Sequence, residues 1–310
     1  MQKKILIAID NSTSSRQTVE YAGRMQGLLR DLVFTLLHIQ PAISQFLLDE
    51  ARRSGKVQVE LNRVAARNAE AAKALLAKYK NLLVRAGAAE SAVEVLTLPR
   101  HLGVAKDILD QAQQGLFDAI LVGRRGISSL QQMFMGSVSA HLIENSQVIP
   151  VWLVDGHVDS MRIMAAVDGS ESALRAVEHL GFVLSGNPQA KVRFFHVVPR
   201  LKDYCEIDFN QGAVEGFEAL IAQSDKRCMD DFFAAALSKL RAAGVQESQI
   251  ETRTGATLIS VGETILKAAR DGGFGTIVMG RRGMNKSFFG GKVSYAVSQK
   301  LSDAALWLVP

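Results

Sequence analysis

The chain has 310 residues, of which 48% are hydrophobic and 22% are charged, and its formal net charge is +5. This composition is typical of a globular protein and excludes a disordered chain. The length allows one large domain or two ordinary ones. The charge is mild, and no dense tract of Lys and Arg indicates a nucleic-acid surface, so we expect no nucleic-acid partner.

The cysteine content and the N-terminal residues bear on the compartment. Cys205 and Cys228 are 23 positions apart with no CxxC, which argues against a zinc site and a disulfide framework. The apolar stretch after Lys4 ends at Asp10 and is too short for a secretory signal. No run approaches the ~18 apolar residues of a membrane span. We therefore expect a cytoplasmic protein with no membrane partner.

The first half alternates short apolar runs with amphipathic ones. Residues 42–56 are polar and irregular, and Gly87 ends a long helical pattern. Strands are predicted over 5–9, 33–39, 93–98, 119–122 and 148–154. Helices are predicted around Val19, Ala22 and Met25, and over 57–86, 104–113 and 138–145.

The same order of elements begins again after a polar linker at 155–160. A period near 157 residues indicates a duplicated domain rather than a solenoid, so we predict domains at 1–155 and 161–310. The equivalent residues are Asp10 and Asp168, Ser12 and Ser170, Gly23 and Gly181, His38 and His196, Gly123-Arg124-Arg125-Gly126 and Gly280-Arg281-Arg282-Gly283, and Trp152 and Trp307.

Strands that are apolar on both faces and alternate with helices predict a parallel sheet that is covered on both sides. Right-handed crossovers make each half a doubly wound domain. Ligands of such sheets bind beyond the carboxyl ends of the strands, where the strand order reverses. If the first and fourth strands flank that point, Asp10 and Gly123 face one crevice.

A glycine loop lies between the strand at 119–122 and the helix at 138–145. Gly123-Arg124-Arg125-Gly126 is followed by nine residues and then by Gly136-Ser137. Glycine permits a close approach of the backbone and positive φ values, and the first turn of a helix holds anions with its free N–H groups. This arrangement predicts a backbone cradle for phosphate. The alternative is that the glycines only make a tight turn.

At these positions the chain resembles the universal stress proteins in their tandem form. The nucleotide-binding branch of that family carries G-x-x-G, nine residues, and then G-S or G-T, and the first half matches every fixed position. The Asp after strand one and the His near the end of strand two also fit, and the resemblance covers essentially the whole chain. It implies an α/β fold of two tandem, doubly wound, five-stranded parallel-sheet domains like those of the adenine nucleotide alpha hydrolases.

The resemblance also implies ATP, with a Mg²⁺ ion as an option, in the first crevice. Asp10 would contact adenine and Ile39 would lie near the base, while the loop and the helix start would hold the phosphates. The last strands, at 148–154 and 304–309, would pair the two domains within one molecule, and a homodimer stays open. The implied nucleotide-binding residues are Asp10, Ile39, Gly123, Arg124, Gly126, Gly136, Ser137, Val138 and Ser139.

The second half departs from the motif. Only seven residues separate Gly283 from Gly291, and Lys292 replaces the hydroxyl residue. Lys292 can meet phosphate as a point charge, but we expect the shorter loop to misplace the N–H groups, leaving this site weak or empty. The residues of this second candidate site are Asp168, Val197, Gly280, Gly283, Gly291 and Lys292.

Each of these residues also has a structural interpretation that needs no ligand. The aspartates could cap helices instead of binding a ligand, and Ser12 and Ser170 are predicted to be caps. The paired histidines and tryptophans are predicted to be structural. The loop arginines are either exposed surface or phosphate contacts. The segment 201–224 is either a lid or a surface for a partner.

No G-x-S-x-G, H-E-x-x-H or P-loop motif is present, and no general base stands out, while Ser137 could assist a Mg²⁺ ion. This absence favours a binding module. The resemblance implies a stress-response or signalling module that binds ATP and acts on an unknown protein partner, with slow hydrolysis at most and no assigned catalytic residue. The alternative is a nucleotide-free tandem scaffold or chaperone-like protein that binds another ligand or a partner in the second crevice. A weak ATP hydrolase is a third reading.

Overall fold

The computed structural model describes residues 2–125, 135–198, 214–257, 259–282 and 291–310, and the side chains of all of these except 214–218. Contacts divide the chain into two compact units. Unit 1 comprises Met1–Gln26 and Asp31–Ile149, and unit 2 comprises Gly27–Arg30 and Pro150–Pro310.

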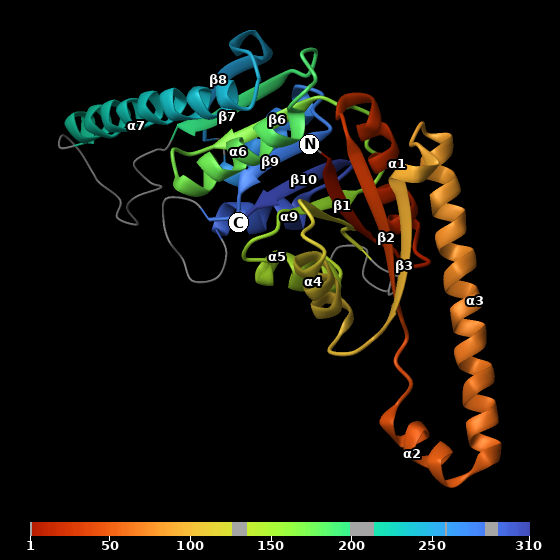
Figure 1. The fold of residues 1–310 in the computed structure, drawn as a ribbon. Helices are drawn as coiled ribbons and strands as arrows, with labels where there is room; N and C mark the ends of the chain where they lie inside the picture. The colour runs from red at the N-terminus through yellow and green to blue at the C-terminus, as the bar shows by residue number, and fades with distance from the viewer. Residues whose placement is uncertain (1, 126–134, 199–213, 258, 283–290) are drawn as a thin grey trace. The chain divides into compact units, whose positions relative to one another are not determined.

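The sheet of unit 1 is parallel, with the strand order β3-β2-β1-β4 (Figure 1). Its core strands are apolar on both faces, as Ile5, Leu6 and Ile7 of β1 illustrate, since all three are fully buried. The strands are β1 (Lys3–Ala8), β2 (Leu32–Gln40), β3 (Val93–Pro99) and β4 (Ala119–Gly123). The helical segments are α1 (Thr13–Leu28), α2 (Gln45–Arg53), α3 (Gly55–Arg85), η1 (Glu90–Ala92), α4 (Val104–Gln114) and α5 (Ser137–Asn145).

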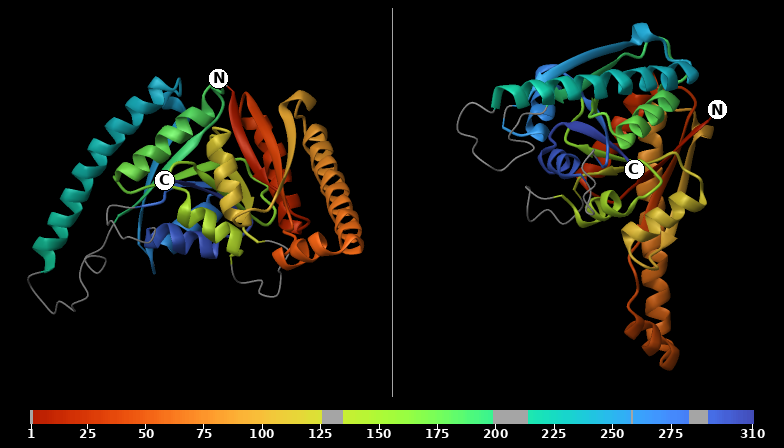
Figure 2. Two further views of the ribbon diagram at one scale, coloured as in Figure 1. Left: turned by 60° about the horizontal axis from the view of Figure 1, so that its bottom comes forward. Right: turned by 90° about the vertical axis from the view of Figure 1, so that its left-hand side faces the viewer.

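Helix α2 corrects the prediction that residues 42–56 are irregular. The hydroxyl of Ser44 caps this helix by accepting the N–H of Leu47 at 3.4 Å, and Arg52 and Arg53 lie in its last turn, where positive charge is favourable. Only Ala51 of α2 is buried, and the apolar side chains of Phe46, Leu47 and Leu48 are exposed. It packs on α3, and the two extend beyond the strands of unit 1 as the orange segments in Figures 1 and 2 show.

Unit 2 contains a larger sheet with the order β5-β10-β9-β6-β7-β8. Its strands are parallel except that β5 runs antiparallel to β10, so the last strands of the two repeats pair as predicted. The strands are β5 (Val151–Asp155), β6 (Ile163–Val167), β7 (Val192–Val198), β8 (Ile250–Ala256), β9 (Thr276–Gly280) and β10 (Ala304–Val309). The helical segments are α6 (Glu171–Leu184), α7 (Val214–Ala242), η3 (Glu247–Gln249), α8 (Val261–Asp271) and α9 (Lys292–Lys300).

The predicted α/β class is therefore confirmed, with helices interleaved between mostly parallel strands. In unit 2 the chain passes from β6 to β7 and β8 in one direction, and from β9 to β10 in the other. Right-handed crossovers then place α6 and α7 on one face of the sheet and α9 on the opposite face. The order of the strands reverses between β6 and β9, and in unit 1 it reverses between β1 and β4.

Candidate functional site

The reversal point of unit 1 brings Asp10 and Gly123 to one edge of the sheet. β1 and β4 are parallel neighbours, with Ile7 opposite Leu121. Asp10 follows the end of β1, and Gly123 is the last residue of β4. The carboxyl ends of both strands therefore meet where ligands of doubly wound sheets bind. The expected adjacency of strands one and four is confirmed.

The carboxylate of Asp10 organises the start of α1. Its Oδ1 accepts the N–H of Ser12 at 3.0 Å, the hydroxyl of Ser12, and the hydroxyl of Ser15 at 2.6 Å. Ser12 in turn accepts the N–H of Ser15 at 3.1 Å, which makes Ser12 the helix cap, as predicted. The three bonds to the Asp10 carboxylate all go to Oδ1, and no described residue makes a hydrogen bond to Oδ2.

Unit 2 repeats this arrangement with one change. Oδ1 of Asp168 accepts the N–H and the hydroxyl of Ser170 at 3.1 and 2.6 Å, and Ser170 caps α6 by accepting the N–H of Ala173 at 3.1 Å. Ala173 occupies the position of Ser15, so the third bond to the carboxylate is absent there. The aspartates therefore support caps in both halves, which leaves the second oxygen of Asp10 as the group that could meet a ligand.

The paired histidines are structural at one ring nitrogen. Nδ1 of His38 lies 2.9 Å from the carbonyl oxygen of Ile9, and Nδ1 of His196 lies 2.9 Å from that of Val167. Each ring thus ties strand two of its repeat to the end of strand one. This is the structural role that the sequence predicted.

His196 has a second partner that the sequence reasoning missed. Its Nε2 lies 3.1 and 3.0 Å from the two carboxylate oxygens of Asp225 in α7. Burial, together with the charges of Asp225 and Asp168, raises the pKa of the nearby Cys228 thiol. At the repeat offset of 157, Asn68 is the residue of the first repeat that is equivalent to Asp225. This exchange of a neutral residue for an acid is the sequence signal that could have identified Asp225. This end of the second crevice is thus more acidic than its counterpart.

The two glycine loops close in the same way. The N–H of Gly136 donates to the carbonyl of Arg124 at 2.8 Å, and the N–H of Gly291 donates to that of Arg281 at 2.8 Å. Gly136 and Gly291 have φ values of −62° and −63°, so neither uses the positive φ that only glycine adopts readily. The shorter second loop therefore reaches its helix with the same closing bond as the first.

The first glycine of each motif is required by helix packing. A Cβ atom on Gly123 would lie 2.3 Å from Oγ of Ser14, and one on Gly280 would lie 2.5 Å from the carbonyl carbon of Ser172. Ser14 and Ser172 are equivalent residues of α1 and α6. The close approach that we predicted at Gly123 is thus to a helix of its own unit.

The arginines of the two loops differ in burial. Arg124 and Arg281 are 3% and 5% exposed, whereas Arg125 and Arg282 are exposed. The interpretation of all four as exposed surface is therefore wrong for the first arginine of each pair. Burial and the neighbouring charge of Arg282 lower the pKa of Arg281. A cation held in this way would be stabilised by an anion.

The helices after the two loops begin without a side-chain cap. Neither Gly136 nor Gly291 supplies a side-chain cap, and Ser137 and Lys292 are exposed in the first turns of α5 and α9. Ser139 is buried and its hydroxyl donates to the carbonyl of Gly123 at 2.7 Å, so its role is structural.

For the remaining candidate residues the structure gives at most the burial of the side chain. Ile39 and Val197 end their strands with 9% and 8% exposure, and Val138 is half-buried. Gly126, Gly283 and the greater part of the predicted lid, 199–213 with Cys205, lie outside the described residues.

No group of three or more His, Cys, Asp or Glu side chains among the described residues is arranged to hold a metal ion. No helix in the described part of the chain has the length and apolar character needed to cross a membrane.

Comparison with known proteins gives consistent matches. The sequence model of the universal stress protein family matches residues 1–155 and 160–305. Universal stress protein YxiE of Bacillus subtilis (strain 168) is 29% identical over 154 residues, which are 50% of this chain and 99% of that protein.

One solved structure that covers nearly the whole chain has the same fold. A universal stress protein from Archaeoglobus fulgidus DSM 4304 is 18% identical, with 99% of this chain and 97% of that chain covered, at a TM-score of 0.65. A universal stress protein in complex with cAMP is 20% identical, with 48% of this chain and 97% of that chain covered, at a TM-score of 0.34. A likeness of the latter degree says nothing of the ligand of this chain.

Proposed function

The chain belongs to the universal stress protein family, and we propose that it is a stress-response module that binds ATP in the crevice of unit 1 with little or no hydrolysis. The proposed ligand spans two ends of that crevice. In this proposal Asp10, after β1, would contact one part of the ligand, and the loop between β4 and α5 would hold the other.

The observation that carries this proposal is that the two carboxylate oxygens of Asp10 have different hydrogen-bond partners. One carboxylate oxygen holds Ser12 and Ser15, and Oδ2 is left to accept a hydrogen bond from the amino group of adenine. Ile39 would then lie beside the base. A carboxylate that served only as a cap support would not need to leave an oxygen at the sheet edge where ligands bind.

The phosphates would lie on the uncapped first turn of α5. Its free N–H groups and positive dipole end favour an anion, and Ser137 adds an exposed hydroxyl that could also meet a Mg²⁺ ion carried with ATP. Gly126 and Arg124 complete the proposed cradle. Slow hydrolysis is expected because Asp10, the acid at this crevice, is engaged by two serines and is assigned to the base rather than to a water.

We propose that the second crevice binds ATP weakly or not at all. Its loop closes with the same hydrogen bond, but two residues are missing from the loop and Lys292 replaces the serine hydroxyl. Asp225 and Asp168 also add negative charge near Cys228. Gly280, Gly283 and Gly291 would then maintain architecture rather than hold phosphate.

Calorimetric titration of the nucleotide-stripped protein with Mg-ATP tests both proposals through the stoichiometry. We expect one site per chain, lost in Gly136→Asp and retained in the matched Gly291→Asp variant. Two sites would contradict the proposal for unit 2. No binding would overturn the proposed function and favour the nucleotide-free scaffold. Turnover that disappears in Ser137→Ala would instead indicate an ATP hydrolase.

A further inference from the structure

Unit 2 contains a hollow of about 570 Å³ that the nucleotide proposal does not use. It lies at the amino ends of β6, β7 and β8, whereas the second crevice lies at their carboxyl ends. A strand of five residues is roughly 16 Å long, so the two places are separate. We propose that this hollow is a second ligand site, which binds a small organic anion with a phosphate or carboxylate group on an apolar body.

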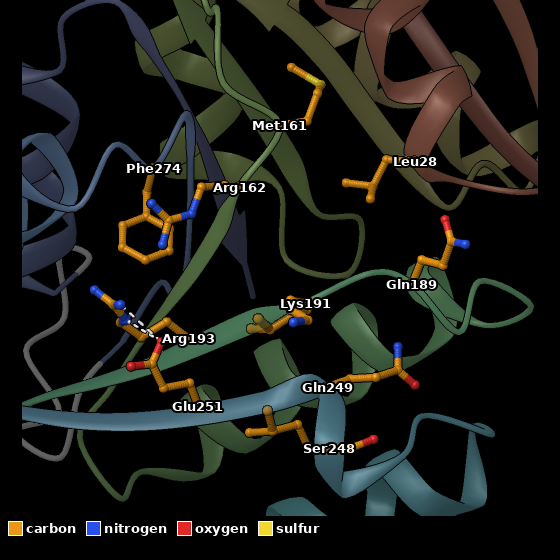
Figure 3. Close-up of a pocket in the computed structure, with 12 residues that line it drawn as sticks. Leu28, Met161, Arg162, Gln189, Lys191, Arg193, Ser248, Gln249, Glu251 and Phe274 are labelled. Carbon is orange, nitrogen blue, oxygen red and sulfur yellow. Dashed lines mark hydrogen bonds and ion pairs between the residues drawn. The ribbon is translucent and has the colours of Figure 1, made fainter.

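Positive charge dominates the lining (Figure 3). Three cations, Arg162, Lys191 and Arg193, stand against one carboxylate, Glu251. That carboxylate is already engaged, because it accepts from Arg193 at 2.9 and 3.0 Å and from Arg253 at 2.9 Å. Lys191 is exposed and forms no ion pair with any described residue. The lining of the hollow therefore carries more positive than negative charge, and its one carboxylate does not neutralise Lys191.

The first repeat provides an internal comparison for each cation. Lys4, the equivalent of Arg162, donates to the carbonyl of Gly115 at 2.5 Å and lies 5.0 Å from the ring of Phe117. Arg162 likewise donates to the carbonyl of Gly272 and lies 4.5 Å from the ring of Phe274. This cation has the same structural role in both repeats, so it is not by itself evidence of a ligand.

The other two cations are particular to the second repeat. Val33 and Thr35 occupy the positions of Lys191 and Arg193. Thr35 and Arg193 are both cross-strand partners of a glutamate, Glu94 or Glu251, so the strand register is the same in the two repeats. Unit 1 thus adopts the same strand register without charged residues at these two positions. The fold of unit 2 therefore does not require Lys191 and Arg193 for packing.

The geometry indicates what the ligand would contact. Arg193 bonds Glu251 through Nε and Nη2, which leaves Nη1 for an anion. Figure 3 shows Lys191 between Arg193 and Gln189, with Leu28 and Met161 across the hollow. Lys191 and Arg193 on one side and the apolar Leu28 and Met161 across from them suit an anionic group attached to an apolar body. The volume is within the range of small-molecule sites.

Calorimetry with phenyl phosphate as the probe tests the proposal on the full chain. We expect one saturable site whose affinity falls as NaCl is raised. Inorganic phosphate, which has the charge alone, and benzyl alcohol, which has the ring alone, should bind at least tenfold more weakly. The double variant Lys191→Val/Arg193→Thr introduces the residues of the first repeat and should lower the affinity for phenyl phosphate at least tenfold.

Three controls separate this site from the nucleotide site. Lys226→Leu removes an exposed charge of α7 that does not line the hollow and should change the affinity less than twofold. Lys191→Val alone, at an exposed position, should weaken binding without lowering the Tm. Gly136→Asp should leave phenyl phosphate binding intact even if ATP binding is lost. Absence of saturable binding, binding that persists in the double variant, or one-for-one competition by ATP would each overturn the proposal.

Discussion

Trp152 and Trp307 stack face to face in unit 2, with ring centroids 3.9 Å apart and planes 6° from parallel. They are opposite one another in the antiparallel β5–β10 pair and are 1% and 0% exposed. They are also equivalent residues of the two repeats. The duplication therefore brings a residue against its own counterpart, which an antiparallel pair of equivalent strands allows.

Replacing Trp307 with alanine should lower the free energy of unfolding by about 3–5 kcal/mol, because the cavity would lie beside a second buried indole. Urea denaturation followed by circular dichroism measures the loss. Val148→Ala, at a side chain that is 75% exposed, is the control and should change the stability by less than about 0.5 kcal/mol. A loss of similar size in both variants would contradict the assignment of this stack to the core.

The stability of the fold should fall in acid because of His179. This ring accepts the indole N–H of Trp152 at Nε2, 3.1 Å away, and burial lowers its pKa to about 4. The unfolded chain has an ordinary histidine pKa of about 6.5. Between these values the unfolded state binds a proton that the folded state does not, so the free energy of unfolding decreases by up to about 3 kcal/mol as the pH falls from 6.5 to 4.

Comparison with His179→Gln isolates this contribution, since Gln keeps a neutral acceptor for Trp152. The stability difference between wild type and variant should be constant above pH 6.5 and should shift in favour of the variant below it. The protein has two tryptophans, both at this cluster, so their fluorescence reports the same titration. Parallel pH profiles for the two proteins would rule out His179 as the source.

Alanine at the first motif glycines should be destabilising without any ligand. Gly280→Ala should cost about 1–3 kcal/mol, because the new Cβ meets backbone atoms of Ser172 at 2.5 and 2.7 Å. Gly123→Ala should cost less, since the atoms that its Cβ would meet, Oγ of Ser14 at 2.3 Å and Cβ of Ser14 at 2.9 Å, belong to a side chain and not to the backbone. Thermal unfolding of the apo protein measures both changes.

The control for these variants is Gly27→Ala, in α1, where a Cβ would meet nothing within 4 Å. It should raise the stability by about 0.4–1 kcal/mol. Motif variants that are as stable as wild type and lose only ATP binding would show that these glycines serve the ligand rather than the helix contact.

The cap residues should behave alike in the two units. Ser12→Ala and Ser170→Ala should each lower the free energy of unfolding by about 1 kcal/mol, because each removes the acceptor of a first-turn N–H. Denaturation of the apo protein tests this expectation. If Ser12→Ala leaves the apo stability unchanged but weakens ATP, then Ser12 acts on the ligand instead of the helix.

The sequence predicted most elements because the apolar runs and the duplication agree. The pattern over 57–86 predicted α3 (Gly55–Arg85), and the strand at 304–309 coincides with β10. Helix α2 was missed because its nine residues are too few to show a repeated apolar stripe, since Phe46, Leu47 and Leu48 are consecutive. The helix packs on α3, which lies later in the chain. The pairing of Asp225 with His196 was missed because the two residues are 29 positions apart and belong to different elements.

The sequence by itself determined the repeated α/β plan, the family, and the position of the glycine loops, because these depend on local pattern and spacing. Only the tertiary structure decided how each candidate side chain is used. One oxygen of Asp10 accepts hydrogen bonds within the fold and the other does not. Arg124 is buried while Arg125 is exposed, and Gly123 lies against Ser14. The tertiary structure also gathered Lys191, Arg193 and Phe274 around one hollow, because parallel strands bring their amino ends together at one edge whatever their separation in the chain.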